Sequence, residues 1–419
     1  MSIFQKLKAY SSTILALTDQ AVVSGSNFLI GIVLARVLGI EGYGLFALLW
    51  MIVLFGKSIN QAFVTRPMMS LAPKKESEES ASYIATLHYL QYLTSFGIGI
   101  FVFILLLFGQ YFDIEITDNR WFWVMPSIVV LHLIYDFYRS QSFVKQDVVF
   151  ALILDIILFG GHFLAVFILW YYDNLSVTNA LIGIGFAHFV VVILGLFKYF
   201  SFNFNTNILK ETILYHFTFS KWLIGTALLQ WFSGNFFIIV AAALMSEAAV
   251  GAVRIVQNVM GLTHVLFLAM ENMVPVKAAL HYKEGGLKQL KTYLIYITSR
   301  AGILVGGILL FLAIFRTYII DFLYGAEYIE YSYLVIGFCL TYILIFIGHP
   351  LRFALLTLEV TKPMFISYVL GAVFSLILAY PLVGRFGLVG VLIGIFVTQG
   401  LSQLVYVYYL KRAGKDLKS

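Results

Sequence analysis

Long runs of hydrophobic residues, separated by short polar stretches, recur along the whole chain. Each run is long enough for a membrane-spanning helix, which needs about 20 mostly apolar residues. The runs lie at 12–37, 43–65, 83–108, 121–139, 148–171 and 179–199, then at 219–244, 250–275, 291–315, 331–350, 364–384 and 387–410. The pattern predicts an all-α polytopic membrane protein with twelve transmembrane helices.

The composition supports this prediction. Of the 419 residues, 61% are hydrophobic and only 11% are charged, whereas soluble domains carry about 25% charged residues. A soluble protein is therefore excluded. The single cysteine, Cys339, excludes an internal disulfide and a cysteine metal site.

The basic residues indicate how the helices are oriented. Of the 27 Lys and Arg residues, 20 fall in the tails and in the loops that we assign to one side. The four in the opposite loops are Arg36, Arg120, Arg316 and Arg385. By the positive-inside rule, both termini are expected in the cytoplasm. The basic excess is explained by topology, so we expect no nucleic-acid partner.

The two sets of six helices share sequence landmarks. Gly44 and Gly251 are separated by 207 positions, and the same separation recurs between the sixth and twelfth spans. We therefore predict two six-helix lobes, residues 1–200 and 201–419, related as parallel repeats. Repeats of this kind commonly enclose a cavity and work by alternating access.

Polar residues concentrate in the first two helices of each predicted lobe. In the eighth span they recur at three- and four-residue steps, which places them on one helix face. Polar groups are costly in hydrocarbon, so we expect these faces to line a shared cavity. The candidate residues are Asp19 in the first span, Lys57 and Gln61 in the second, Gln230 in the seventh, and Arg254, Gln257, Asn258, His264 and Glu271 in the eighth.

Lys57 lies ~12 Å from the cytoplasmic end of its span, close to the middle of the bilayer. It therefore needs an anion, a carboxylate or a water-filled cavity. Two interpretations remain open: Lys57 binds an anionic ligand, or it pairs with Asp19 or Glu271. Arg254 lies nearer the outer end of its span, where its side chain could extend to the surface. Its place on the polar face favours the cavity.

The two carboxylates allow a second role. Asp19 and Glu271 either bind a coupling proton or cation, or balance the charges of Lys57 and Arg254. His264 is a candidate proton relay, and the other helix histidines are expected to be packed or hydrogen-bonded.

Residues 29–50, LIGIVLARVLGIEGYGLFALLW, resemble the junction between the first two helices of one transporter family. This family is the polysaccharide transporter branch of the multidrug/oligosaccharidyl-lipid/polysaccharide flippase superfamily. Its pattern reads roughly L-A-R-x-L-G-P-x-x-F-G-x-F-A. Here Ile40 replaces the proline and Tyr43 replaces a phenylalanine. Residues 138–156 are also similar to the family's link between the fourth and fifth helices.

The resemblance implies a flippase that moves undecaprenyl-diphosphate-linked oligosaccharides across the bacterial inner membrane for surface polysaccharide synthesis. It implies a cationic cavity, in which Lys57 and Arg254 would hold phosphate oxygens. The implied partners are the lipid-linked substrate, the bilayer, and the glycan polymerase and glycosyltransferases of the pathway. We expect no enzymatic activity, and no cofactor because the sequence has no nucleotide-binding motif.

Four further residues are assigned structural or gating roles. Arg36 matches the family pattern but lies at the exit of the first span. Pro67 and Pro275 mark the ends of the second and eighth spans. Arg300 has apolar neighbours on its helix, which favours a structural pair with Asp155 or another carboxylate near the cytoplasm.

Two other functions remain open. Multidrug antiporters of the same superfamily bind cationic drugs through membrane carboxylates, so Asp19 and Glu271 keep that function possible. A membrane glycan polymerase or ligase is a third candidate. Such enzymes usually need a large outer loop with convergent catalytic groups, whereas the outer loops of this chain are short.

Overall fold

The computed structural model of the protein describes residues 3–111, 118–199 and 206–416, and these are almost entirely helical. The chain divides into two compact units, Met1–Leu228 and Leu229–Ser419. The division falls within helix α7 (Thr206–Leu244). The lobe boundary at 200/201 precedes this helix and stays a prediction.

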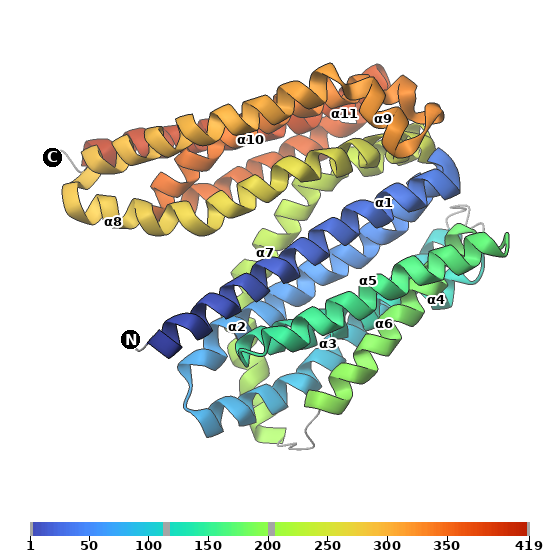
Figure 1. The fold of residues 1–419 in the computed structure, drawn as a ribbon, viewed down its shortest axis with the longest axis horizontal. Helices are drawn as coiled ribbons and strands as arrows, with labels where there is room; N and C mark the ends of the chain where they lie inside the picture. Colours follow the sequence, from blue (N-terminus) through green and yellow to red (C-terminus); the bar gives the residue numbers. More distant parts are fainter. Residues whose placement is uncertain (1–2, 112–117, 200–205, 417–419) are drawn as a thin grey trace. The chain divides into compact units, whose positions relative to one another are not determined.

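Unit 1 is drawn in blue to green in Figure 1. It contains α1 (Ile3–Asn60), a π-helical segment η1 (Gln61–Thr65), α2 (Arg66–Leu71), η2 (Ala72–Lys74), α3 (Ser77–Tyr111), α4 (Trp121–Val144), α5 (Val148–Tyr171), α6 (Val177–Tyr199) and the first part of α7. Unit 2 contains the rest of α7, α8 (Glu247–Ile314), α9 (Arg316–Tyr324), η3 (Ala326–Tyr331), α10 (Tyr333–Thr357) and α11 (Lys362–Asp416).

Three glycines interrupt the longest helices. Gly39 in α1, Gly286 in α8 and Gly387 in α11 have positive φ angles of 70°, 61° and 57°. Glycine adopts this conformation without the steric cost that a Cβ atom imposes. Figure 1 shows that α1, α8 and α11 each reverse direction along their length.

Within the described ranges, nine helices are long and apolar enough to cross a membrane, counting each interrupted helix once. The interruptions at Gly39 and Gly286 fall between two of the spans expected from the sequence, and Gly387 is the first residue of the last expected span. The all-helical prediction is confirmed, while the number of twelve spans and the side of the termini stay predictions.

Helix α4 is the centre of unit 1. It packs against α3, α5, α6 and α1. Its apolar segment is more buried than that of any other of the nine membrane-length helices in the described ranges. Leu87 of α3, Phe137 of α4 and Leu154 of α5 are fully buried in the shared core. Because α4 is buried on several sides, charged side chains on this helix have the least access to water.

Helices α5 and α6 approach each other through small residues. A Cβ atom added to Gly161 would lie 2.7 Å from Cβ of Ala187, and one added to Gly183 would lie 2.7 Å from Cβ of Ala165. Each helix therefore contributes one glycine and one alanine, four residues apart, to this interface. Such small-residue interfaces let membrane helices pack closely.

In unit 2, α10 packs against both α8 and α11. Helix α11 also approaches α7 closely, because a Cβ atom on Gly394 would lie 2.0 Å from the ring of Phe237. Val335, Phe338 and Phe353 of α10 are buried in this packing.

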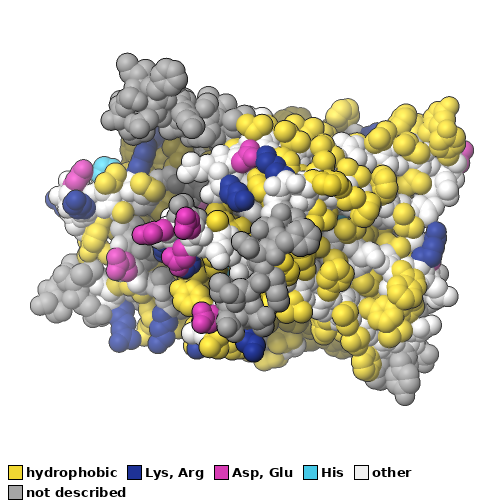
Figure 2. Space-filling model, turned by 90° about the horizontal axis from the view of Figure 1, so that it is seen from below, with side chains coloured by type: hydrophobic (Ala, Val, Ile, Leu, Met, Phe, Trp, Pro, Cys, Tyr) yellow, Lys and Arg dark blue, Asp and Glu magenta, His cyan; other side chains and the backbone are white. Residues whose placement is uncertain are grey.

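The outer surfaces of both units are strongly apolar. Phe197 is 88% exposed, and Ile303 and Phe322 are almost as accessible. On the face shown in Figure 2, hydrophobic side chains predominate, and most charged ones gather toward the left of the view. Soluble monomers rarely expose contiguous apolar areas of this size, so these surfaces suit contact with lipid.

Asp147 stabilises the start of α5 outside the apolar helices. Its carboxylate accepts a hydrogen bond from the backbone N–H of Phe150 and forms an ion pair with Lys198 at 2.5 Å. The hydrogen bond from Lys198 holds the pKa of Asp147 below its ordinary value. The carboxylate thus joins the N-terminus of α5 to the C-terminal end of α6.

We expect Asp147→Ala to lower stability by about 1 kcal/mol, the usual effect of losing an N-cap. Asp147→Asn should cost less, because asparagine keeps the cap and loses only the charge. Since folding lowers the pKa, the advantage of Asp147 over Asn is present above pH ~4 and fades as the pH falls through the folded-state pKa. Thermal unfolding in detergent at several pH values would measure both effects, and a pH-independent difference would contradict the ion-pair contribution.

Candidate binding and coupling sites

Lys57 and Gln61 meet on a buried carboxylate of α4. The ammonium of Lys57 lies 2.8 Å from Oδ1 of Asp136, and the Gln61 side chain donates to Oδ2 at 3.1 Å. The Asp136 side chain is 5% exposed and that of Lys57 is 29% exposed. The ion pair therefore has a buried anion and a more accessible cation.

A π-helical turn begins directly at Gln61 and ends before the first turn of α2, which contains Pro67. The turn leaves the carbonyl of Phe63 available to another helix, and Nδ1 of His216 donates to it at 2.9 Å. Nε2 of His216 lies 2.6 Å from the hydroxyl of Tyr83. Single π turns occur often at functional sites, and this one adjoins the Lys57 ion pair.

A second buried charge cluster surrounds Arg139 of α4. Its guanidinium lies 2.5 Å from Oδ2 of Asp19 on α1 and 2.7 Å from Oδ2 of Asp155 on α5. The hydroxyl of Tyr135 donates to the other oxygen of Asp155. Both carboxylates are almost fully buried. With both ionised, the cluster would carry one more negative than positive charge.

These contacts correct two predicted pairings. Asp19 pairs with Arg139 and does not pair with Lys57, whose partner is Asp136. Asp155 is also bound by Arg139 and Tyr135, so the predicted pair of Asp155 with Arg300 is wrong.

Buried histidines lie close to these clusters. Nδ1 of His188 donates to the carbonyl of Ile184 at 2.9 Å, so in the neutral ring its Nε2 accepts from Nδ1 of His132, also at 2.9 Å. The ring of His162 is 5.2 Å from that of His188. His132 and His188 are thus hydrogen-bonded and His162 is packed, as the sequence predicts. Among the described residues, no group of His, Cys, Asp and Glu side chains could hold a metal ion.

In unit 2, Arg254 is oriented by amide groups. Its guanidinium donates to Oε1 of Gln257 at 2.8 Å and to Oδ1 of Asn235 on α7 at 3.2 Å. Asn258 donates to the hydroxyl of Tyr324 at 2.9 Å. The predicted polar face at the start of α8 therefore holds Arg254 and Gln257 together, whereas Asn258 turns to α9.

Glu271 has its own arginine. Its Oε1 lies 2.7 Å from the guanidinium of Arg352 and 3.7 Å from Nδ1 of His349, both on α10. This finding identifies Arg352, and not Arg254, as its ion-pair partner. His264 is exposed on α8, with its ring 6.5 Å from that of Phe267. Gln230 is exposed on α7.

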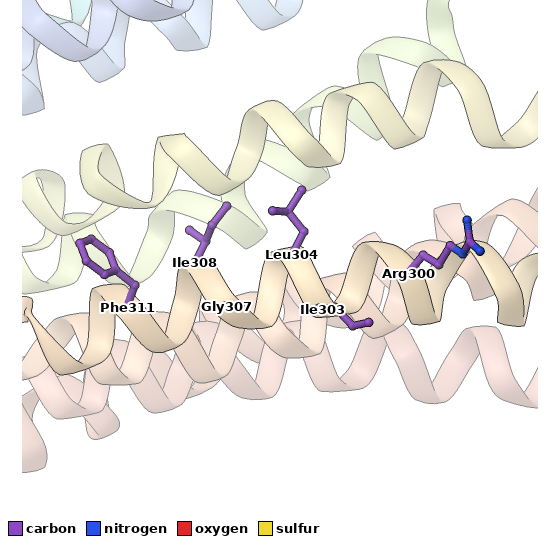
Figure 3. A pocket seen from close by; sticks show the side chains of 6 residues that line it. All are labelled: Arg300, Ile303, Leu304, Gly307, Ile308 and Phe311. Atoms are coloured by element: carbon purple, nitrogen blue, oxygen red, sulfur yellow. The ribbon is translucent and has the colours of Figure 1, made fainter.

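Arg300 lies on an outward face of α8. Its guanidinium stacks over the ring of Tyr296 at 4.5 Å. It lies at one end of an open, shallow pocket of about 650 Å³ along this helix. Figure 3 shows Arg300 with the other lining residues, which are Ile303, Leu304, Gly307, Ile308 and Phe311. The stacked aromatic ring supports the charge here in place of the predicted carboxylate.

The remaining structural candidates lie in helices. Arg36 is exposed on α1, close to the break at Gly39. Pro67 is buried in the first turn of α2, and Pro275 lies within α8. Their gating roles stay predictions.

Asp136 is the functional candidate that the sequence analysis missed. It lies in the apolar run 121–139, and an acidic residue inside such a run is a signal in itself. Asp136 and Arg139 are three positions apart and so share one face of α4. That spacing could have identified α4 as the source of both counter-charges.

Comparison with known families gives one match. The profile of a family described as "Polysaccharide biosynthesis protein" matches residues 33–333, which is most of the chain. The chain belongs to this family. The resemblance found at residues 29–50 is thereby confirmed. Comparison with curated protein sequences gave no match.

Solved structures share the fold of this polysaccharide biosynthesis protein. An inward-facing multidrug resistance MATE family transporter of the MOP superfamily matches with a TM-score of 0.73 and 16% identity, covering 96% of each chain. The lipid II flippase MurJ matches with a TM-score of 0.63 and 15% identity, covering 98% of this chain and 88% of MurJ.

A MOP superfamily transporter from Pyrococcus furiosus Vc1, described as having a binding pocket of reverse polarity, matches with a TM-score of 0.57 and 12% identity. It covers 96% of this chain and 94% of its own. At these identities the comparisons establish the fold, which together with the apolar helices makes this a multi-pass membrane protein.

We expect Lys57→Met to destabilise unit 1 by about 3 kcal/mol, the low end of the range for a broken buried ion pair, because it leaves a buried carboxylate without its partly exposed cation. Asp136→Asn should cost less, since the partly exposed Lys57 can reach water. The double variant should be less destabilised than the sum of the two single variants. Denaturation midpoints of all four proteins in detergent would test this coupling, and strict additivity would contradict it.

Proposed function

We propose that this protein is a flippase for undecaprenyl-diphosphate-linked oligosaccharides in the bacterial inner membrane and that it works by alternating access. The observation that carries the proposal is the accessible ammonium of Lys57, held among apolar helices by a buried counter-ion. Membership of a polysaccharide biosynthesis family supports a lipid-linked glycan as the substrate. The proposed role is transport, without chemical change of the substrate.

The ion pair suits an exchange of anions. Lys57 is more accessible than Asp136, so an incoming phosphate can approach the cation without unburying the carboxylate. Charge-assisted hydrogen bonds between ammonium or guanidinium groups and phosphate are strong in a water-poor site. Arg254, oriented by Gln257 and Asn235, is the second proposed phosphate ligand. Gln61, Asn258 and Gln230 are proposed to complete the polar lining.

The shared fold is compatible with a lipid substrate. MurJ is a lipid II flippase, so helices in this arrangement can serve a lipid-linked cargo. The glycan polymerase and glycosyltransferases of the same pathway are the proposed functional partners.

The test is complementation of a deletion strain, with surface glycan as the measurement. We expect Lys57→Ala and Arg254→Ala each to lower surface glycan at least about tenfold, the effect of losing ~1.4 kcal/mol of binding. Lys57→Arg should retain part of the activity, because it keeps the charge. Arg385→Ala is the matched control, since Arg385 is an exposed cation stacked on Phe386.

Equal amounts of each variant in the membrane must be verified by immunoblot. Normal surface glycan in both Lys57→Ala and Arg254→Ala would contradict the cationic site. A deletion strain with altered drug resistance and normal glycan would favour a multidrug antiporter, which the MATE-like fold also allows. Loss of long chains alone would favour a polymerase.

We further propose that the cluster of Asp19, Arg139 and Asp155 binds the coupling proton or cation. Two buried carboxylates share one guanidinium, and a bound monovalent cation or proton would balance the remaining charge. The charge of Glu271 is balanced by Arg352, whereas Asp19 shares its arginine with Asp155, so Asp19 is the stronger candidate. His264 stays a proposed relay.

Ligand binding to the folded state raises its stability, so we expect the melting temperature of the protein to respond to the coupling ion. Replacing choline by Na⁺ at constant ionic strength, or changing the pH, should shift the melting temperature by several degrees. In a chain of this size, 1 kcal/mol of stability corresponds to about 2–4 °C or less. Asp19→Asn should abolish the response. Glu271→Gln is the control, and equal responses in wild type and Asp19→Asn would contradict the proposal.

A further inference from the structure

A second cavity lies within unit 2, between α8, α10 and the end of α11. Its volume is about 600 Å³, within the range of ligand pockets. Its walls are mostly aliphatic. The lining residues include Leu290, Lys291, Thr298, Pro350, Ala354 and Leu410.

The helix ends explain why the cavity opens at one end. Proline has no N–H to donate to the preceding turn, so Pro350 interrupts the hydrogen-bond ladder of α10. Small Ala354 follows on the same face, and α10 ends at Thr357. Leu410 lies close to the end of α11. One end of the cavity therefore lies where the helices end, at the level expected for a membrane interface.

One rim of the cavity is basic. Lys291 is exposed at the start of the helical segment that follows Gly286. It has no ion-pair partner within the described part of the chain. Lys288 on the same helix, and Lys411 and Arg412 next to Leu410, are also exposed. This end of an otherwise apolar cavity therefore suits an anionic group.

The cavity extends along α8 for part of the depth of one lipid leaflet. From Lys291 to Thr298 the helix rises ~10 Å, and lysine side chains extend several ångströms farther toward water. Half of a bilayer core is about 15 Å thick. An acyl chain whose headgroup lies beside Lys291 would thus pass along the cavity to Thr298 and continue toward the middle of the bilayer.

We propose that this cavity binds one acyl chain of an anionic membrane phospholipid, with the lipid phosphate paired to Lys291. Chain length favours a phospholipid over the lipid-linked cargo, because the cavity encloses a much larger share of an acyl chain than of the several-fold longer undecaprenyl chain. The basic rim also matches an anionic headgroup. The bound lipid fills the space that Pro350 and Ala354 leave between α8 and α10.

The experiment is native mass spectrometry of the full-length protein in detergent, incubated with phosphatidylglycerol or with zwitterionic phosphatidylcholine. A lysine at a lipid phosphate contributes about 1 kcal/mol. We therefore expect Lys291→Gln to reduce bound phosphatidylglycerol about fivefold. Wild type should retain phosphatidylglycerol in preference to phosphatidylcholine. Arg385→Gln is the charge control and should bind like wild type.

A second pair of variants tests the apolar part. Thr298→Phe fills the cavity and should prevent retention, whereas Thr292→Phe places the same ring on the exposed face of the same helix, outside the cavity. If Thr298→Phe fails to fold, Lys291→Gln decides alone.

Three results would overturn the proposal. They are equal phosphatidylglycerol retention by Lys291→Gln and wild type, equal retention of both lipids by wild type, and displacement of phosphatidylglycerol by equimolar undecaprenyl phosphate. The measurement involves no transport, so its failure would leave the flippase proposal intact.

Discussion

The packing of unit 1 depends on the free-energy cost of leaving a charged side chain unpaired among apolar helices. Helix α4 lies at the centre of this unit and supplies both a carboxylate, Asp136, and a guanidinium, Arg139, from neighbouring turns. Each is matched by charges on other helices, Lys57 for the first and Asp19 with Asp155 for the second. Since an unpaired ion would be costly at these positions, the ion pairs fix which helices lie beside α4 and at which height.

Much of this architecture can be predicted from the sequence, because apolar run length and glycine positions are local properties. The polar faces of the second and eighth spans are equally local, and the structure keeps Lys57 with Gln61 and Arg254 with Gln257. Helical periodicity gives the face of a residue without giving its neighbour. Partners such as Asp136 depend on which helices pack together, and that information lies in tertiary contacts.

The same reasoning explains the incorrect pairings. Asp19 and Lys57 belong to adjacent spans of similar polarity, so pairing them is the simplest assumption from the sequence alone. Packing of α1 against both α4 and α5 gives Asp19 a nearer cation in Arg139. Arg300 shows that a charge in an apolar segment does not by itself predict an acidic partner. An aromatic ring, here that of Tyr296, can also stabilise an arginine.

The π-helical segment after Lys57 has a mechanical consequence. A π turn contains one residue more than an α turn, so converting it to α geometry would rotate all that follows by about 100° and shift it by ~1.5 Å along the axis. Gln61 and the carbonyl of Phe63 lie in this turn and are tied to Asp136 and His216. The segment therefore holds the residues after it in a shifted helical register. Asp136, the counter-ion of Lys57, restrains this register at Gln61, and His216 of α7 restrains it at Phe63.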